Sequence, residues 1–277
     1  MGNRTIVITG ASDGIGAVAA RRLSSDGNTV VVVGRSEEKT RAVASKLGAD
    51  YLVTDFADLT KVRRLADELL SRYPQIDVLA NNAGGVMSKA RELTKDGHER
   101  TFQVNHLAPF LLTTLLMDRL IESRAAVLNT ASDANYRFGD IDINDLDGRK
   151  KYTPFKAYCN SKLANILFTK ELHRRYHRGG LSTVAFHPGN VASNFAADSG
   201  SFLRFVYTTP LKRLLLIDTE RGSDELVWLA STTPDTDWQS GGYYDRHKPG
   251  RTNAQVEDPH LARELWERSE AMVRTSV

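Results

Sequence analysis

Short apolar runs rich in valine, isoleucine and leucine alternate along the chain with longer stretches in which apolar residues recur every three or four positions. The short runs are typical of β-strands and the longer stretches of amphipathic helices. Strands are predicted at 5–9, 29–33, 51–54, 76–80, 126–129, 181–186 and 242–244. Continuous runs such as 30–33 suit strands buried on both faces, so the alternation predicts an α/β fold with a doubly wound parallel sheet.

The length of the chain is suited to one large core. It has 277 residues, of which 41% are hydrophobic and 26% charged. We therefore expect a single domain over 1–277, and right-handed crossovers through the helices make its sheet a Rossmann type.

Three segments stand apart from the alternation of strands and helices. Residues 137–151 are polar and predict a surface loop, and residues 245–277 form a C-terminal extension. Residues 194–217 carry aromatic, leucine and basic side chains and are interpreted as a substrate lid. A helix lying on a membrane surface is the alternative for this last segment, because apolar and basic faces together favour interfacial binding.

The first predicted strand runs directly into Gly10-Ala-Ser-Asp-Gly-Ile-Gly16, which precedes a helical pattern. A strand, a glycine turn and a helix together can hold dinucleotide phosphates at the helix N-terminus. Gly10 would allow the tight turn, Gly14 the close approach of backbone to pyrophosphate, and Gly16 the packing of helix on strand. The spacing is not Gly-x-Gly-x-x-Gly, however, and a glycine-rich turn alone is often only a loop.

Tyr158 and Lys162 are four residues apart in a stretch with helical spacing, so a phenol and an ammonium project from one helix face. A free phenol has a pKa near ~10, and a nearby positive charge favours the phenolate and lowers that pKa toward neutrality. The pair can therefore transfer a proton. Taken alone, such a pair is more often found on the surface of an amphipathic helix.

Several motifs occur in a fixed order along the chain. They are Thr9-Gly10-x-x-x-Gly14-Ile15-Gly16, Asn81-Asn82-Ala83-Gly84, Asn105, Ser132 with Tyr158-x-x-x-Lys162, and Pro188-Gly189. Over about residues 4 to 244 the chain thereby resembles the short-chain dehydrogenase/reductase family. The stretches 104–113, 158–169 and 219–222 resemble its retinol-dehydrogenase-like subgroup.

The resemblance implies four catalytic residues. Tyr158 would donate a proton to a carbonyl oxygen as hydride arrives from nicotinamide, and Lys162 would lower the tyrosine pKa and hold the nicotinamide ribose. Ser132 would hydrogen-bond the substrate oxygen, and Asn105 would anchor a water in a proton relay. Taken alone, Ser132 is one of many loop serines and Asn105 a buried polar group that kinks a helix. No Gly-x-Ser-x-Gly elbow surrounds Ser132, which argues against a serine hydrolase.

Arg35 follows the second strand, where an NAD-preferring fold usually places an acidic residue. Because Arg35 can bind a 2′-phosphate through two hydrogen bonds, NADP(H) is favoured and NAD(H) is the alternative. Asp13 in the glycine turn argues partly against a phosphate. The resemblance implies the following cofactor contacts: Gly10, Ser12, Gly14, Ile15, Gly16, Arg35, Asp55, Asn82, Tyr158, Lys162, Val191 and Ser193.

Two of these contacts carry more specific expectations. Asp55 is expected to meet the adenine amino group, and a helix cap formed by Asp55 or Asp58 is its structural alternative. Val191 and Ser193 are expected to meet the nicotinamide carboxamide and the pyrophosphate.

Composition narrows the remaining possibilities. The net charge of +3 and a pI near 8.9 come without the basic stripe expected of a nucleic-acid binder. The single cysteine, Cys159, excludes an intrachain disulfide, fits a reducing compartment and is interpreted as a packing residue. The seven histidines show no metal-binding spacing. Because no signal peptide or long apolar run is present, we expect a cytoplasmic protein without stable membrane insertion.

These observations favour an NADP(H)-dependent oxidoreductase that interconverts a small hydrophobic alcohol and its aldehyde or ketone. Family habit adds a possible homo-oligomer. A non-catalytic dinucleotide sensor or scaffold is the alternative, because a Rossmann fold alone does not imply activity. A sugar epimerase or dehydratase is less favoured, since little chain remains after Tyr244 for a substrate domain.

Overall fold

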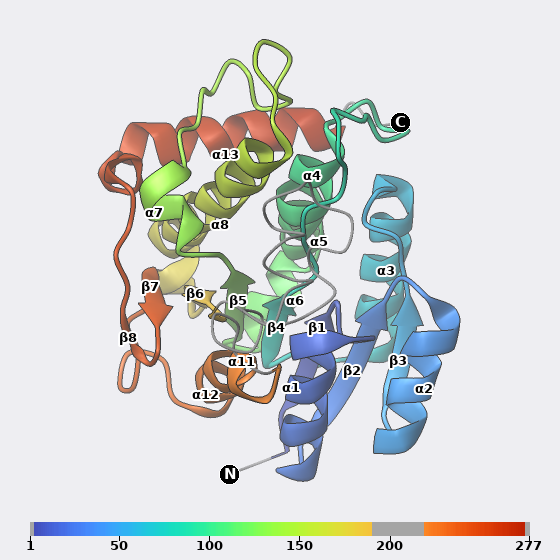
Figure 1. The fold of residues 1–277 in the computed structure, drawn as a ribbon. Coiled ribbons are helices and arrows are strands. Elements are labelled where there is room, and N and C mark those ends of the chain that lie inside the picture. Colours follow the sequence, from blue (N-terminus) through green and yellow to red (C-terminus); the bar gives the residue numbers. More distant parts are fainter. Residues whose placement is uncertain (1–2, 190–218, 275–277) are drawn as a thin grey trace, which may run out of the picture.

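The computed structural model describes residues 3–189 and 219–274. The predicted lid at 194–217, Val191 and Ser193 lie outside the described residues. A central eight-stranded sheet has the order β3-β2-β1-β4-β5-β6-β7-β8 (Figure 1). Its strands are β1 Thr5–Thr9, β2 Thr29–Gly34, β3 Asp50–Val53, β4 Val78–Asn81, β5 Ala126–Thr130, β6 Ser182–His187, β7 Gly242–Asp245 and β8 Lys248–Pro249.

The seven predicted strands are confirmed, and β1 to β7 pair in parallel. β8 was not predicted and pairs antiparallel with β7. A tight turn connects these two strands, so the chain reverses without a helical crossover. From β1 the chain first adds β2 and β3 on one side of the sheet. It then crosses back and places β4 on the other side of β1. The order therefore reverses between β1 and β4, where open α/β sheets bind ligands.

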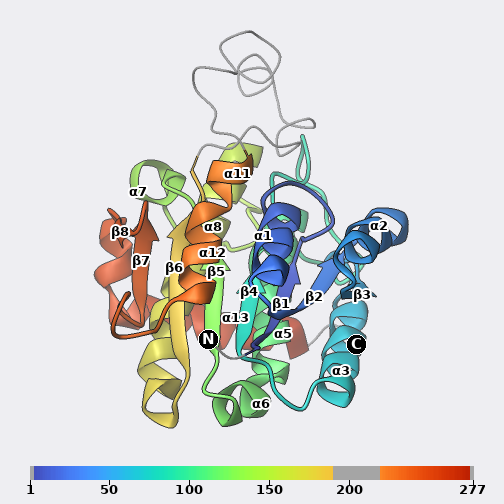
Figure 2. The same ribbon diagram turned by 90° about the horizontal axis from the view of Figure 1, so that it is seen from below.

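Helices cover both faces of the sheet (Figure 2). They are α1 Gly14–Ser25, α2 Glu37–Leu47, α3 Leu59–Arg72, α4 Arg100–Phe102, η1 Gln103–Leu107, α5 Ala108–Leu115, α6 Met117–Glu122, α7 Ala134–Phe138, α8 Pro154–Tyr176, η2 His177–Gly179, α11 Thr219–Gly222, α12 Asp224–Ser231, η4 Ala254–Glu257 and α13 Pro259–Arg274. In Figure 2, α1 and α12 lie in front of the sheet and α13 behind it.

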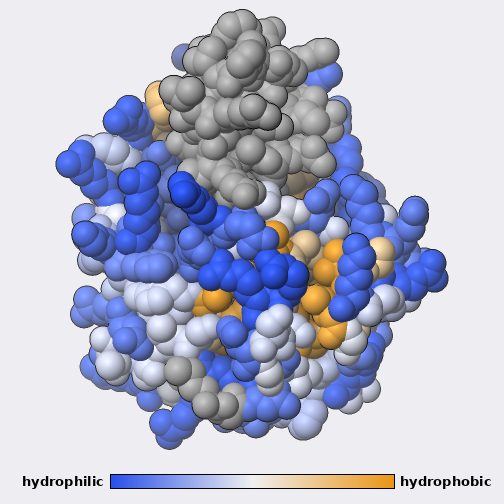
Figure 3. Space-filling model, turned by 60° about the horizontal axis from the view of Figure 1, so that its bottom comes forward, coloured by the Kyte–Doolittle hydropathy of each residue, from blue (hydrophilic) through white to orange (hydrophobic). Residues whose placement is uncertain are grey.

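Alternation along the strands builds two apolar cores. Ile6 and Ile8 pack with α1 and α12, whereas Val7 points to the opposite face, which α3, α5 and α8 cover. Leu265 and Trp266 of α13 are buried in this second core, so the C-terminal segment contributes to it. The face of the molecule in Figure 3 is mainly hydrophilic, with apolar atoms visible in recesses between polar side chains.

Glu225 of α12 holds the turn between β7 and β8. Its carboxylate is 5% exposed and accepts hydrogen bonds from the backbone N–H of His247, with N to O distances of 2.9 and 3.2 Å. Arg246 and His247 both adopt left-handed backbone conformations in this turn. Burial raises the pKa of Glu225 to about 7 from an ordinary value of 4.5.

This shift predicts a pH-dependent stability. Between about pH 4.5 and 7 the folded chain retains a proton that the unfolded chain releases, so this contribution to stability is lost as the pH rises through 7. We expect the free energy of unfolding of Glu225→Gln, measured relative to the wild type, to be about 1 to 3 kcal/mol higher at pH 8 than at pH 5. Urea unfolding at both pH values measures the difference. Glu264→Gln, an exposed change on α13, is the control, and an equal response of both variants would contradict the assignment.

Candidate active site

The predicted site residues that the structure describes gather at one edge of the sheet. The glycine turn follows β1, Asn82 follows β4 and Ser132 follows β5, and these strands run parallel. Their carboxyl ends therefore meet at the same edge (Figure 1). Tyr158 and Lys162 come to this edge from α8.

The glycine turn has the backbone geometry that its sequence predicts. Gly10 and Gly14 have φ angles of +67° and +55°, in the left-handed region that favours glycine. A Cβ atom on Gly16 would lie 2.4 Å from the Gly10 carbonyl oxygen, so a larger residue there would displace the turn. Apart from the Gly14 N–H, which donates to Asp13, the first-turn N–H groups of α1 suit an anionic phosphate because they have no acceptor within the helix. The turn therefore fits a dinucleotide.

Asn82 holds the glycine turn in place through hydrogen bonds. Its Nδ2 donates to the Thr9 carbonyl at 3.0 Å, and the Thr9 hydroxyl oxygen accepts from the backbone N–H groups of Asn82 and Ala83. Asn82 thus ties the end of β4 to the end of β1. In this structure its side chain contacts the backbone of the turn, a positioning role for the predicted cofactor residue.

The glycine turn also faces the end of β2. A Cβ atom on Gly34 would lie 2.7 Å from Cβ of Ser12, so the turn contacts the end of β2. Arg35 is exposed immediately after this contact. Asp13 caps α1 by accepting from the Gly14 N–H at 2.8 Å, and its carboxylate lies 3.4 Å from the Lys39 ammonium. The acidic charge that argued against a phosphate is therefore paired with a lysine that the sequence analysis did not name.

Asp55 follows β3, and its Oδ1 accepts from the Ala57 N–H at 3.0 Å. Asp58 caps α3 by accepting from the Lys61 N–H at 3.2 Å. Of the two aspartates considered as helix caps, Asp58 therefore has that role. The adenine contact of Asp55 stays a prediction.

Tyr158 and Lys162 are both buried, with exposed fractions of 9% and 2%. The Lys162 Nζ lies 5.7 Å from the centre of the Tyr158 ring and donates to the Thr130 carbonyl at 2.9 Å. Burial lowers the pKa of Lys162 to about 8, because the charged form loses hydration. These positions exclude the surface-pair alternative and place an ammonium beside the Tyr158 ring.

Asn105 lies in η1, a π-helical turn in which the Ala108 N–H donates to the Gln103 carbonyl. Its side chain forms two hydrogen bonds with the backbone of Gly85, each 2.9 Å long. A Cβ atom on Gly84 would lie 2.9 Å from Asn105 Oδ1 and 3.3 Å from Lys162 Nζ. The glycine at this position therefore lets the loop after β4 lie between Asn105 and Lys162.

Ser132 lies between β5 and α7, and its Oγ accepts from the Ala134 N–H at 3.2 Å. Ala134 packs against the small cluster formed by Val86, Tyr158 and Cys159. Burial raises the pKa of the Cys159 thiol to about 12, which supports the packing interpretation of this residue.

Some polar groups that support the site were missed by the sequence analysis. The Thr130 carbonyl, Asn165 and the backbone of Gly85 contact the predicted catalytic residues directly. Backbone carbonyls carry no sequence signature, and only proximity to Ser132 or Lys162 in the chain indicates them. Asn165 had a usable signal, because it follows Lys162 by three residues and shares its helix face.

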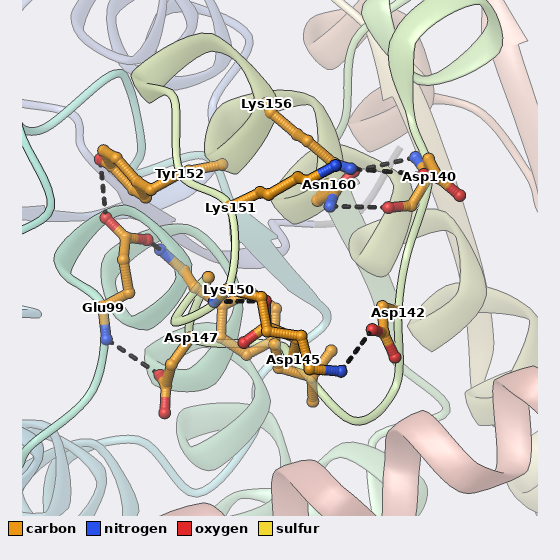
Figure 4. Close-up of a pocket in the computed structure, with 14 residues that line it drawn as sticks. Glu99, Asp140, Asp142, Asp145, Asp147, Lys150, Lys151, Tyr152, Lys156 and Asn160 are labelled. Carbon is orange, nitrogen blue, oxygen red and sulfur yellow. Dashed lines mark hydrogen bonds and ion pairs between the residues drawn. The ribbon is translucent and has the colours of Figure 1, made fainter.

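A separate hollow of about 280 Å³ lies between the loop at 140–152 and the helices α4 and α8 (Figure 4). The Tyr152 hydroxyl donates there to Glu99 at 3.2 Å, and the Glu99 N–H donates to Asp147 at 3.0 Å. Lys150 and Asp142 form an ion pair at the loop surface. None of the predicted site residues lines this hollow.

The described residues also bear on metals and membranes. In the ranges 3–189 and 219–274, no cluster of three histidine, cysteine or acidic side chains is placed to bind a metal. Across the same ranges, every helix is too short or too polar to span a bilayer.

Comparison with known proteins identifies the family. The pattern of the short chain dehydrogenase family matches residues 4–203. "Putative daunorubicin C-13 ketoreductase DnrU" from Streptomyces sp. (strain C5) is 41% identical over 98% of this chain and 92% of its own. "Retinol dehydrogenase 13" from Homo sapiens is 35% identical over 98% and 84%.

A solved structure agrees with these relatives. The crystal structure of an uncharacterized protein from Mycobacterium Paratuberculosis is 34% identical, covers 98% of this chain and 93% of its own, and superposes with a TM-score of 0.77. The chain therefore belongs to the short-chain dehydrogenase/reductase family, with retinol-dehydrogenase-like relatives, and is an NAD(P)-dependent oxidoreductase that acts on CH–OH groups.

Proposed function

We propose that the protein is an NADP(H)-dependent oxidoreductase that interconverts a hydrophobic alcohol and its aldehyde or ketone, with Tyr158 as the acid and base. The observation that carries this proposal is the buried pair of Tyr158 and Lys162, in which an ammonium lies beside the phenol ring. A buried cation lowers the pKa of a neighbouring phenol, as proton transfer at neutral pH requires.

The residues of the site divide the chemistry among them. A nicotinamide cofactor, when bound at this edge of the sheet, would supply or accept the hydride. Tyr158 donates its phenolic proton to the carbonyl oxygen as negative charge develops there, and in the reverse direction it takes the proton from the alcohol. Lys162 stabilises the resulting phenolate, and Ser132 donates a hydrogen bond to the same substrate oxygen. Asn105 holds the loop after β4 through its two hydrogen bonds to Gly85.

A hydrophobic substrate is supported by aromatic residues near Tyr158. Phe138 at the end of α7 and Phe155 at the start of α8 lie edge to face, with ring centres 5.1 Å apart. They are 52% and 41% exposed, and Phe155 lies one helical turn before Tyr158. The names of the relatives, a retinol dehydrogenase and a daunorubicin ketoreductase, point to substrates with large apolar bodies. Such a body is expected to contact the two rings.

A panel of carbonyl compounds tests the function. All-trans-retinal, decanal, daunorubicin and a polar aldose are each offered with NADPH, and loss of nicotinamide absorbance is followed. We expect faster oxidation of NADPH with one or more of the apolar compounds than with the aldose. Equal rates for the aldose and the apolar compounds, or no oxidation with any of them, would contradict the proposal.

Arg35 is exposed directly after β2, so its removal should change the preference for NADPH over NADH. Arg35→Ala should weaken NADPH binding by about tenfold or more and leave NADH nearly unchanged, because a charge-assisted contact to the 2′-phosphate contributes roughly 1.5 to 3 kcal/mol. Titration of each nucleotide measures the two affinities. Arg41→Ala, an exposed change on α2, is the matched control. Equal losses for both nucleotides would remove Arg35 from the phosphate site.

A further inference from the structure

A series of buried side chains connects the candidate active site to α13. His106 Nδ1 lies 3.2 Å from Asn165 Oδ1, and His106 Nε2 lies 2.9 Å from the hydroxyl of Ser269. On its other side, Asn165 Nδ2 donates to the carbonyls of Asn105 and Thr130 at 3.0 and 3.2 Å. The three side chains are at most 3% exposed. The established roles of the family motifs account for none of these three.

Chemistry determines the direction of each hydrogen bond. Because Nδ2 of Asn165 faces two carbonyl oxygens, it must be the amide nitrogen, and Oδ1 faces His106. His106 Nδ1 therefore carries the proton, and Nε2 accepts from Ser269. This arrangement requires a neutral imidazole. Burial among Phe102 and other aromatic rings lowers the pKa of His106 to about 4, so the imidazole is neutral at ordinary pH.

The carbonyl of Asn105 needs this donor for a reason that lies in the sequence. In an α-helix it would accept from the N–H of residue 109, which is Pro109 and has no N–H. The π-helical turn η1 lies at the same place. Asn165 donates to the carbonyl in place of the missing backbone N–H.

The carbonyl of Thr130 is shared by two donors. Lys162 Nζ donates to it at 2.9 Å and Asn165 Nδ2 at 3.2 Å. Since Lys162 is 2% exposed, this carbonyl compensates part of the hydration that its ammonium loses on burial. A group that fixes the carbonyl therefore also fixes the ammonium beside Tyr158.

We propose that Asn165 is a positioning residue for catalysis, which holds the Thr130 and Asn105 carbonyls in place, and that His106 and Ser269 fix its orientation. This inference rests on the proposed function, since it acts through Lys162 and Tyr158. It makes α13 part of the support of the active site, although Ser269 touches none of the proposed catalytic side chains.

A neighbouring group of buried polar side chains, joined to the Asn165 backbone carbonyl through Asn129 and Thr169, provides the matched control. Asn81 Nδ2 donates to the Thr113 hydroxyl at 3.0 Å and to Asn129 Oδ1 at 2.9 Å. Thr113 is as buried as Ser269 and also lies on a core helix. The Thr113 hydroxyl contacts Asn81 and the Pro109 carbonyl and contacts neither Lys162 nor the Asn165 side chain, so Thr113→Val removes a buried hydroxyl without removing a hydrogen bond of the proposed support.

Kinetics and unfolding of four variants test the proposal, with whichever of decanal or all-trans-retinal the wild type reduces. Asn165→Leu should lower kcat by about tenfold or more while KM for NADPH stays within about threefold. His106→Leu should lower kcat about fivefold, and His106→Asn less, because its amide can still donate to Asn165. Thr113→Val should leave kcat within about twofold at a similar loss of stability.

Coupling between the two ends of the series separates positioning from simple stability. Ser269→Ala should lower kcat about three- to fivefold in the wild type and have little effect when Asn165→Leu is already present. Fully additive effects would overturn the proposal. So would equal kcat values for His106→Leu and His106→Asn, or a kcat loss in Thr113→Val as large as in Asn165→Leu.

A measurement on the free protein completes the test. NMR titration of the Lys162 side-chain carbon, assigned by its loss in Lys162→Met, should show a lower pKa in Asn165→Leu than in the wild type. An unchanged pKa would overturn the inference. Tyr158→Phe is assayed alongside: if that variant keeps full turnover, the proposed function fails, whereas its inactivity beside a fully active Asn165→Leu contradicts the positioning role alone.

Discussion

Tyr158→Phe should lower turnover by about 10²- to 10⁴-fold and leave nucleotide affinity within about twofold. The variant loses the proton donor and keeps the ring, which is 9% exposed and packs against Val86 and Cys159. Because phenylalanine preserves this packing, we expect the fold and the glycine turn to stay intact. Steady-state turnover and nucleotide titration separate the two quantities.

Tyr73→Phe is the control for this change. Tyr73 follows α3 and donates its hydroxyl proton to Asp50 at the start of β3, at 2.7 Å, on the opposite edge of the sheet from the proposed site, so its loss should leave turnover unaltered. If Tyr158→Phe kept wild-type turnover on a verified substrate, another group would have to be the acid and base.

The placement of the proposed catalytic pair on one helix face was predictable because it depends on local geometry. Lys162 follows Tyr158 by four positions, and helical periodicity alone places them on one face. The apolar runs of the strands likewise predicted the parallel sheet, since strands buried on both faces need continuous apolar sequence. What the pattern left open was the burial of the pair, which depends on β5 and the loop after β4 packing over α8.

Features that depend on contacts between distant segments escaped prediction. Asn105 was expected to anchor a water or to kink a helix, and the structure shows that its side chain binds Gly85 from within a π-helical turn. The Lys39 partner of Asp13 lies 26 residues along the chain, and β8 pairs through a turn of two residues. None of these has a periodic signature. Pro109 did carry a signal, because a proline in a helix always leaves one carbonyl without its usual donor.

Lys162→Met should change activity and stability in opposite directions. Turnover should fall by about 10²- to 10³-fold, because the phenol of Tyr158 loses the cation that favours its ionised form. Stability should rise by about 1 to 3 kcal/mol at pH 7, since the folded protein no longer buries an ammonium. The Thr130 carbonyl keeps Asn165 as a donor, so the change does not leave this carbonyl unsatisfied.

The lowered pKa of Lys162 determines how the stability of Lys162→Met, relative to the wild type, changes with pH. The pKa of Lys162 is about 8 in the folded protein and 10.5 ordinarily. Between these values the unfolded chain binds a proton that the folded chain has released, so wild-type stability rises with pH and the penalty is complete below about pH 8. The advantage of Lys162→Met should therefore shrink as the pH rises from 8 to 10.5. Urea unfolding across this range measures it.

Lys156→Met on the same helix is the control, because Lys156 is only partly buried and is paired with Asp140 at the surface. It should change neither turnover nor the pH dependence of unfolding. A Lys162→Met protein that is less stable than the wild type at pH 7 would show that the ammonium is fully compensated by its surroundings. A stable variant with normal turnover would remove Lys162 from the mechanism. Loss of activity together with a gain in stability is the result that a buried catalytic cation requires.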